Sequence, residues 1–266
     1  MTTIPAYAGE QRVTQVRVLF SEWTKLRSLP STVWSLLTML VLVVGFGIVY
    51  SMVRVTRPPA DPSTFDAMGV SLSGVQLAQF AIGVLGVLLM TGEYATGSIR
   101  VSLAAVPRRL ELLWGKAVTF GLTTLALCVP AVFVAFLAGQ SILSAENLDI
   151  GLGEAGVARA VLGSALFLAA VGLLGLGLGG LLRNTAGGIA TLFGLLFAPQ
   201  ILVGFLPESV SDHVYKYVPA AAGQAVMFLK PDPRYSLSPW AGLGVFCLYT
   251  AVVLAGAAWQ LRRRDA

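Results

Sequence analysis

Long apolar stretches separated by short charged segments dominate this chain. Six intervals contain no charged residue, and each is longer than the roughly 20 residues that a helix needs to cross the hydrocarbon core of a bilayer: 28–53, 67–92, 117–145, 160–182, 184–207 and 235–261. We therefore predict six transmembrane helices, placed at about 31–53, 69–90, 117–141, 158–182, 185–206 and 239–261.

The composition agrees with this pattern. Hydrophobic residues make up 56% of the 266 residues, charged residues only 12%, and the mean hydropathy is +0.79. A soluble helical domain is disfavoured because its helices would need charged outer faces. The predicted fold class is all-α integral membrane, with a cytoplasmic N-terminal segment 1–29, a six-span transmembrane domain 30–262 and a cytoplasmic tail 263–266.

The distribution of Lys and Arg predicts the orientation. With the N-terminus in the cytoplasm, the inner segments carry twelve Lys or Arg and the outer segments six. Cytoplasmic loops are enriched in these residues. We therefore expect a multi-pass protein with both termini in the cytoplasm.

The segment before the first span has the pattern of an amphipathic helix. Between Val13 and Leu26 the apolar residues, Phe20 and Trp23 among them, share one face, and Glu22 and the basic residues lie mostly opposite. Such a helix lies in the headgroup layer, parallel to the membrane. A cytosolic helix packed on a partner protein is the alternative. The residues assigned to this interfacial helix are Arg17, Phe20, Trp23, Lys25 and Arg27.

A charged segment from Thr91 to Ala117 separates the second and third spans. Glu93, Gly97 and Arg100 share one helical side, and Ile99 and Leu103 share another. Pro107 ends this helix or opens the next, and Gly97 would let another backbone come close. The segment is either a loop that only fixes topology or a short helix that docks on a soluble protein.

Several stretches resemble the membrane-spanning permeases of the ABC type-2 exporter family, particularly its small actinobacterial members. They are "SEWTKLRSLPSTVWSL" at 21–36, "GEYATGSIRVSLAAVPRR" at 92–109, "WGKA" at 114–117 and "SPWAGL" at 238–243 followed by "RRRDA". The resemblance implies an interfacial helix, six spans, a coupling helix between spans two and three that sits on a separate ATP-binding subunit, and a partly re-entrant segment at 207–239. The coupling residues it implies are Glu93, Gly97, Ser98, Ile99, Arg100 and Leu103.

The sequence contains no recognisable ATP-binding or catalytic motif. It has no G-x-x-x-x-G-K-[ST] motif and no H-E-x-x-H motif, so we expect neither catalysis nor a bound cofactor or metal, with ATP and Mg²⁺ held by the partner subunit. No charged residue lies within the six apolar intervals, which disfavours a proton- or ion-coupled carrier. The resemblance implies partnership with two ATPase copies, a second permease copy and the bilayer. No nucleic-acid partner is expected.

A self-sufficient carrier or channel, and a membrane scaffold without transport activity, remain the alternatives. The polar residues of spans two and five that could line a translocation path are Gln76, Gln79, Thr191 and Gln200. Intramembrane Gln and Thr also tie helices together. The small residues Gly172, Gly175 and Gly179 share a face of the fourth span and predict close helix packing. The expected cargo is an antibiotic, a peptide or another amphipathic compound.

Overall fold

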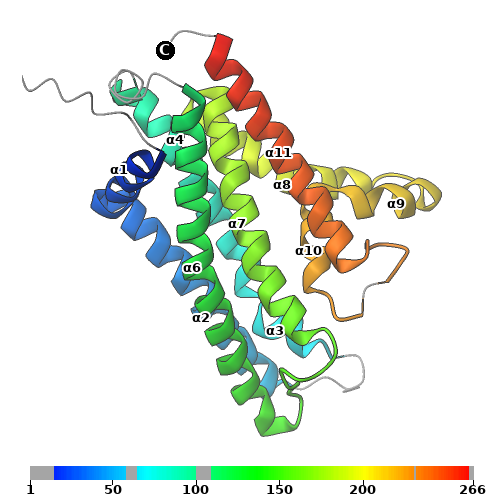
Figure 1. Cartoon of the computed structure of the whole chain (residues 1–266). Coiled ribbons are helices and arrows are strands. Elements are labelled where there is room, and N and C mark those ends of the chain that lie inside the picture. The colour runs from blue at the N-terminus through cyan, green and yellow to red at the C-terminus, as the bar shows by residue number, and fades with distance from the viewer. Residues whose placement is uncertain (1–14, 58–64, 100–108, 231, 264–266) are drawn as a thin grey trace, which may run out of the picture.

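The computed structural model describes residues 15–57, 65–99, 109–230 and 232–263. Within these ranges the chain is helical and contains no strand (Figure 1). Among the described residues, six helices are long and apolar enough to span a membrane: α2 (Pro30–Thr56), α4 (Gly74–Ala95), α6 (Arg109–Leu143), α7 (Val157–Leu182), α8 (Thr185–Val203) and α11 (Pro239–Arg263). The protein is therefore an all-α, multi-pass membrane protein.

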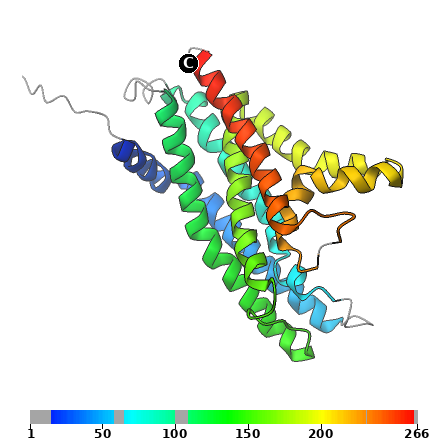
Figure 2. The same ribbon diagram turned by 45° about the vertical axis from the view of Figure 1, so that its right-hand side comes forward.

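Shorter helices connect or flank these six. They are α1 (Gln15–Ser28), α3 (Ala67–Ser71), α9 (Glu208–Val214), α10 (Pro219–Gln224) and the 3-10 turns η2 (Ser144–Glu146), η3 (Tyr215–Tyr217) and η4 (Ala225–Met227). In Figures 1 and 2, α9 projects sideways from the bundle. By contrast, the residues of η4 and nearly all those of α10 are buried, and α10 packs against α8 and α11.

The second span begins later than the sequence pattern predicts, at Gly74 rather than at residue 69. Its expected first turn belongs to α3, whose N-terminus is capped by Asp66 Oδ1, which accepts a hydrogen bond from the Gly69 amide at 2.9 Å. A Cβ at Gly74 would collide with the carbonyl groups of Leu42 and Val43. The helix therefore starts where its backbone touches α2. The third span, in turn, begins at Arg109, before the predicted residue 117.

Helix α7 lies at the centre of the bundle and is the most buried span, followed by α4. The two helices pack backbone to backbone through glycine. A Cβ at Gly86 would collide with the carbonyl of Gly172, and a Cβ at Gly175 would collide with the carbonyl of Gly83. The packing role predicted for the α7 glycines is confirmed. Gly83 and Gly86 likewise serve helix packing.

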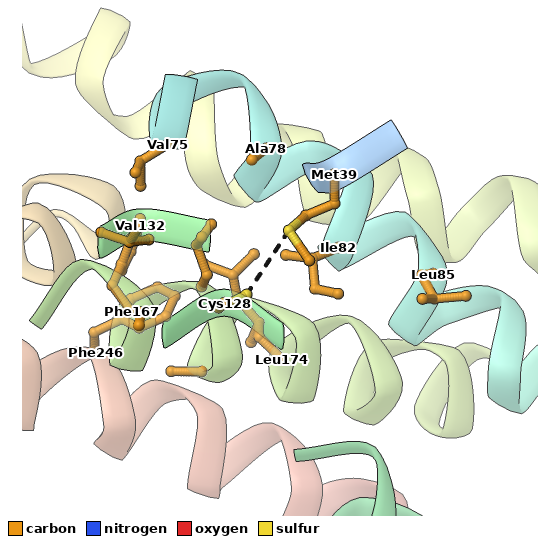
Figure 3. Close-up of a cluster of buried hydrophobic side chains, with 14 of the residues drawn as sticks. Met39, Val75, Ala78, Ile82, Leu85, Cys128, Val132, Phe167, Leu174 and Phe246 are labelled. Carbon is orange, nitrogen blue, oxygen red and sulfur yellow. Dashed lines mark hydrogen bonds between the residues drawn. The ribbon is translucent and has the colours of Figure 1, made fainter. Parts of the chain in front are cut away.

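One apolar core joins α2, α4, α6, α7 and α11 (Figure 3). Its members include Met39, Ile82, Cys128 and Phe167, and the Cys128 thiol lies 3.8 Å from the Met39 sulfur. Cys128 thus packs as a small hydrophobic residue. Cys247 is free and exposed on α11.

The described ends of the chain lie at the same end of the bundle. Figures 1 and 2 place α1 near the end at which α4 stops, α6 starts and α11 finishes. This arrangement agrees with an even number of crossings. The assignment of this end to the cytoplasm stays a prediction.

Candidate coupling and interfacial site

An ion-pair cluster joins three helices at the end of α4. It consists of Glu22 and Lys25 from α1, Glu93 from the last turn of α4, and Lys116 from α6. Lys116 Nζ lies 2.6 Å from Glu22 Oε2 and 2.9 Å from Glu93 Oε1. Lys25 Nζ lies 2.9 Å from Glu22 Oε1 and 2.9 Å from Glu93 Oε1. Each ammonium thus contacts both carboxylates, and the formal charges of the cluster sum to zero.

The cluster exists because α1 presents a buried strip to α6. Val18, Glu22 and Leu26, spaced four residues apart, are buried, and Val18 sits over Gly115, where a Cβ would come within 2.7 Å of its Cγ1. The placement of Glu22 on the polar, outward side was therefore wrong. Its side chain is only 3% exposed, because it turns towards Lys116.

The two most enclosed members of the cluster depend on each other. The side chains of Glu22 and Lys116 are 3% and 6% exposed. A buried charge is tolerated only when it is paired and hydrogen-bonded, and losing one partner is far more costly than losing both. The cluster therefore holds α1 in one position against the ends of α4 and α6.

Lys25 lies at the rim of the cluster. Burial by itself would lower the pKa of its ammonium, but the hydrogen bonds to Glu22 and Glu93 and their negative charges outweigh burial and raise that pKa above 10.5. Its contribution to stability is therefore complete at neutral pH and fades only as the pH rises through this elevated value.

The opposite side of the α4 end is tied to the turn between α7 and α8. The Arg183 guanidinium stacks over the Tyr94 ring at 5.0 Å and donates to the Gln260 carbonyl at 3.3 Å. The Thr185 hydroxyl donates to the Thr91 hydroxyl at 2.9 Å. The last turn of α4 thus contacts α1 and α6 on one side and the α7–α8 turn on the other.

Helix α4 ends at Ala95, and the backbone bends at Gly97, so the predicted continuous helix from Glu93 onwards is wrong. The Gly97 amide donates to the Tyr94 carbonyl at 3.2 Å, and its φ is +70°. This left-handed conformation is typical of the glycine that ends a helix. A Cβ at Gly97 would meet nothing within 4 Å in the structure, so within this chain the glycine provides backbone geometry, not close approach. Helical backbone resumes at Ser98.

We predict that Gly97→Val disturbs this bend and that Gly97→Asn does not. A β-branched residue at a φ of +70° is strained by about 1–2 kcal/mol, whereas Asn visits this conformation readily. Thermal unfolding in detergent should show a lower midpoint for the valine variant alone. Equal midpoints for both variants would show that the bend does not require a left-handed residue.

The remaining predicted coupling residues differ in exposure. Ser98 is exposed, and its hydroxyl lies 2.9 Å from that of Thr96. Ile99 is buried, with 3% of its surface exposed. Arg100 and Leu103 lie outside the described residues.

The predicted interfacial residues all belong to α1. Phe20, Trp23 and Arg27 are exposed, and Lys25 belongs to the ion-pair cluster. Arg17 lies in α1, but its side chain is outside the described structure. An apolar flank therefore remains on α1 beside its buried strip.

The candidate path residues separate into two pairs. On α4, the Gln79 amide donates to the Gln76 backbone carbonyl at 2.8 Å, and Gln76 Oε1 accepts from Gln224 Nε2 of α10 at 2.9 Å. These contacts tie α4 to α10. On α8, Thr191 is exposed and Gln200 is half-buried. No hydrogen bond between the two pairs is found in the described part of the chain.

Sequence reasoning missed several residues of these sites. The helical pattern places Glu22 on the polar face, and it assigns no partner to Lys116, which stands inside the quoted "WGKA" stretch. Phe193 and Phe197 of α8 stack on Phe80 of α4 at centroid distances of 4.8 and 4.6 Å. The spacing of four between Phe193 and Phe197 was a signal that could have placed them on one face.

Comparison of the chain with protein-family models and with curated proteins gives no match. The relation to the exporter permeases therefore rests on the resemblance of the quoted stretches.

Proposed function

We propose that this chain is the permease subunit of an ATP-driven ABC exporter, working as a pair of copies with two separate ATP-binding subunits. The observation that supports this most is the position of the α4 end. The segment assigned to the coupling helix begins at Glu93 in the last turn of α4, which contacts α1, α6 and the α7–α8 turn, and continues past the bend at Gly97. A displacement of that segment by a bound partner would therefore act on α1, α6, α7 and α8 together.

The energy for transport comes from outside the chain in this proposal. Charged residues of the six long helices stand near the helix ends, as Arg54, Glu93 and Lys116 do. Ion-driven carriers keep working charges at membrane depth, because an idle charge there is costly. A partner subunit that binds ATP and Mg²⁺ supplies the free energy for transport by hydrolysing the ATP.

The coupling surface consists of the Gly97 bend and the residues after it. In this proposal exposed Ser98 contacts the ATP-binding subunit and buried Ile99 anchors the segment to the bundle. Arg100 and Leu103, which lie outside the described residues, are assigned to the same contact. ATP-driven closure of the two partner subunits moves both coupling segments together. Symmetric pairing places the transport path along the two-fold axis.

The path runs between the two copies along α4 and α8. Exposed Gln76 and Thr191 and half-buried Gln200 provide polar positions on the two helices that carry the phenylalanine stack. Gln79 is buried and supports Gln76 by donating to its backbone carbonyl. Such a mixed lining suits an amphipathic cargo, such as an antibiotic or a peptide, exported across a bacterial plasma membrane with both termini of the chain in the cytoplasm.

The proposal predicts that Ser98→Trp separates the permease from its ATPase. The variant places a bulky side chain on an exposed position of the coupling surface, so the fold should survive while docking fails. Ser144→Trp is the matched control, because Ser144 is also exposed but lies at the opposite end of α6. We expect copurification of an ATPase encoded beside this gene to fall at least about tenfold for Ser98→Trp only, which corresponds to about 1.4 kcal/mol.

Reconstituted vesicles provide the second measurement. With the ATPase bound, ATP hydrolysis should rise when cargo is added, and cargo should move only when ATP is on the side of the coupling segment. Cargo movement by the purified permease alone, driven by a proton or sodium gradient and indifferent to ATP, would identify a self-sufficient carrier instead.

A further inference from the structure

An apolar groove runs between α1, α2 and α6. Its volume is about 710 Å³, within the roughly 300–1,000 Å³ range of single-ligand sites. Phe20 and Trp23 of α1 form one wall, Val33 of α2 a second, and Leu122 and Ala126 of α6 a third. The ion-pair cluster and the contact of Val18 with Gly115 hold α1 in place, so the groove is built into the fold.

The groove opens on the surface that faces the bilayer. Val33 and Leu122 belong to long apolar helices and are exposed, as is Trp23. The α6 wall extends from Thr119 to Leu127, a length of about 12 Å at 1.5 Å per residue. One leaflet of the hydrocarbon core is about 15 Å deep. The groove therefore has the depth of an acyl chain that runs through one leaflet.

One cation stands at the rim of this groove. Arg27 is the charged residue of its lining, is exposed and lies in the last turn of α1, beside the turn into α2. The neighbouring cations Lys25 and Lys116 are paired with Glu22 and Glu93. No ion pair of Arg27 is found within the described ranges, so its guanidinium can donate hydrogen bonds to a phosphate.

We propose that this groove binds one anionic phospholipid, with an acyl chain along α6 and the headgroup phosphate on Arg27. The exposed apolar walls select the acyl chain. The Arg27 guanidinium, which has no ion pair among the described residues, selects the anionic headgroup. The site does not involve the coupling segment or an ATPase. The lipid-binding proposal can therefore be tested independently of the proposed transport activity.

Fluorescence of Trp23 tests the site directly. A variant keeps Trp23 and replaces Trp34, Trp114, Trp240 and Trp259 with Phe. In detergent, phosphatidylglycerol with brominated acyl chains should quench Trp23 with saturation near one lipid per chain. Brominated phosphatidylcholine should need a concentration about fivefold higher for half-saturation, because a nearby Arg favours an anionic lipid. A variant that keeps only Trp240 should show no headgroup preference.

Two substitutions test recognition of the headgroup and binding of the acyl chain separately. Arg27→Gln should remove the preference for phosphatidylglycerol, and Ala126→Phe should fill the groove and abolish saturable quenching by both lipids. Ala251→Phe is the matched control, because Ala251 is also exposed on a long apolar helix but lies outside the groove. Ala251→Phe should leave the quenching curve unchanged.

Three results would overturn the proposal: no saturable quenching, equal quenching by both lipids, or quenching that emerges only after removal of residues 2–12. The last would identify the N-terminal segment as the occupant. If the single-Trp variant does not fold, native mass spectrometry of the chain with all its tryptophans replaces fluorescence. Retained phosphatidylglycerol should then be lost in Ala126→Phe but kept in Ala251→Phe, and retention in both would reject the site.

Discussion

Lys116→Met should lower the free energy of unfolding by about 3–5 kcal/mol, because it leaves Glu22 and Glu93 with only Lys25 between them at a buried site. Titration with a denaturing detergent in mixed micelles measures this change. A probe on α1 should at the same time show that the helix has left α6. Lys230→Met, at an exposed position, is the control and should change stability by less than about 0.5 kcal/mol.

A double variant shows whether the destabilisation comes from the unpaired charge of Glu22 or from the change in the volume of the Lys116 side chain. Replacing Glu22 with Leu together with Lys116→Met removes one charge of each sign and leaves Lys25 paired with Glu93. Replacement of a whole buried pair by apolar residues is often neutral. The double variant should therefore recover most of the stability lost in the single variant. Unchanged stability of Lys116→Met would contradict the role given to the cluster.

Gly86→Ala should destabilise the bundle, and Gly86→Leu should prevent its correct assembly. The added Cβ would collide with the carbonyl of Gly172 and come within 2.8 Å of the Leu176 amide nitrogen, and neither backbone group can move without separating α4 from α7. Overpacking of this kind costs about 1–3 kcal/mol, occasionally more. Size-exclusion chromatography after heating measures the folded fraction.

Gly194→Ala provides the matched control on another span. A Cβ at Gly194 of α8 would meet nothing within 4 Å, and Ala is favoured over Gly in a helix by up to about 1 kcal/mol. This variant should be as stable as the original chain or more stable. Equal stability of Gly86→Ala and Gly194→Ala would show that α4 and α7 can move apart freely.

The resemblance placed Glu93 and Lys25 in two separate functional segments, the coupling helix and the interfacial helix. The structure brings their side chains to 2.9 Å from each other although they stand 68 positions apart. Helical periodicity relates only residues three or four positions apart. The pairing of a residue from the predicted interfacial helix with one from the predicted coupling helix was therefore beyond sequence reasoning.

The amphipathic pattern of the N-terminal segment likewise predicted local structure but not contacts with distant helices. It correctly indicated a helix, since α1 covers Gln15–Ser28. A single polar face could not reveal that Glu22 turns inwards while Phe20 and Trp23 stay exposed. That division depends on where α6 places Lys116 and Gly115.

The sequence by itself determined the all-helical membrane class, the six long apolar helices and the glycine face of α7, because length, apolarity and small-residue spacing are local properties. The tertiary structure alone decided that α4 starts at Gly74, that α1 is held by buried ion pairs and that a groove opens beside Trp23. Each of these depends on atoms from helices distant in sequence, whose approach is set by packing and by the need to pair buried charges.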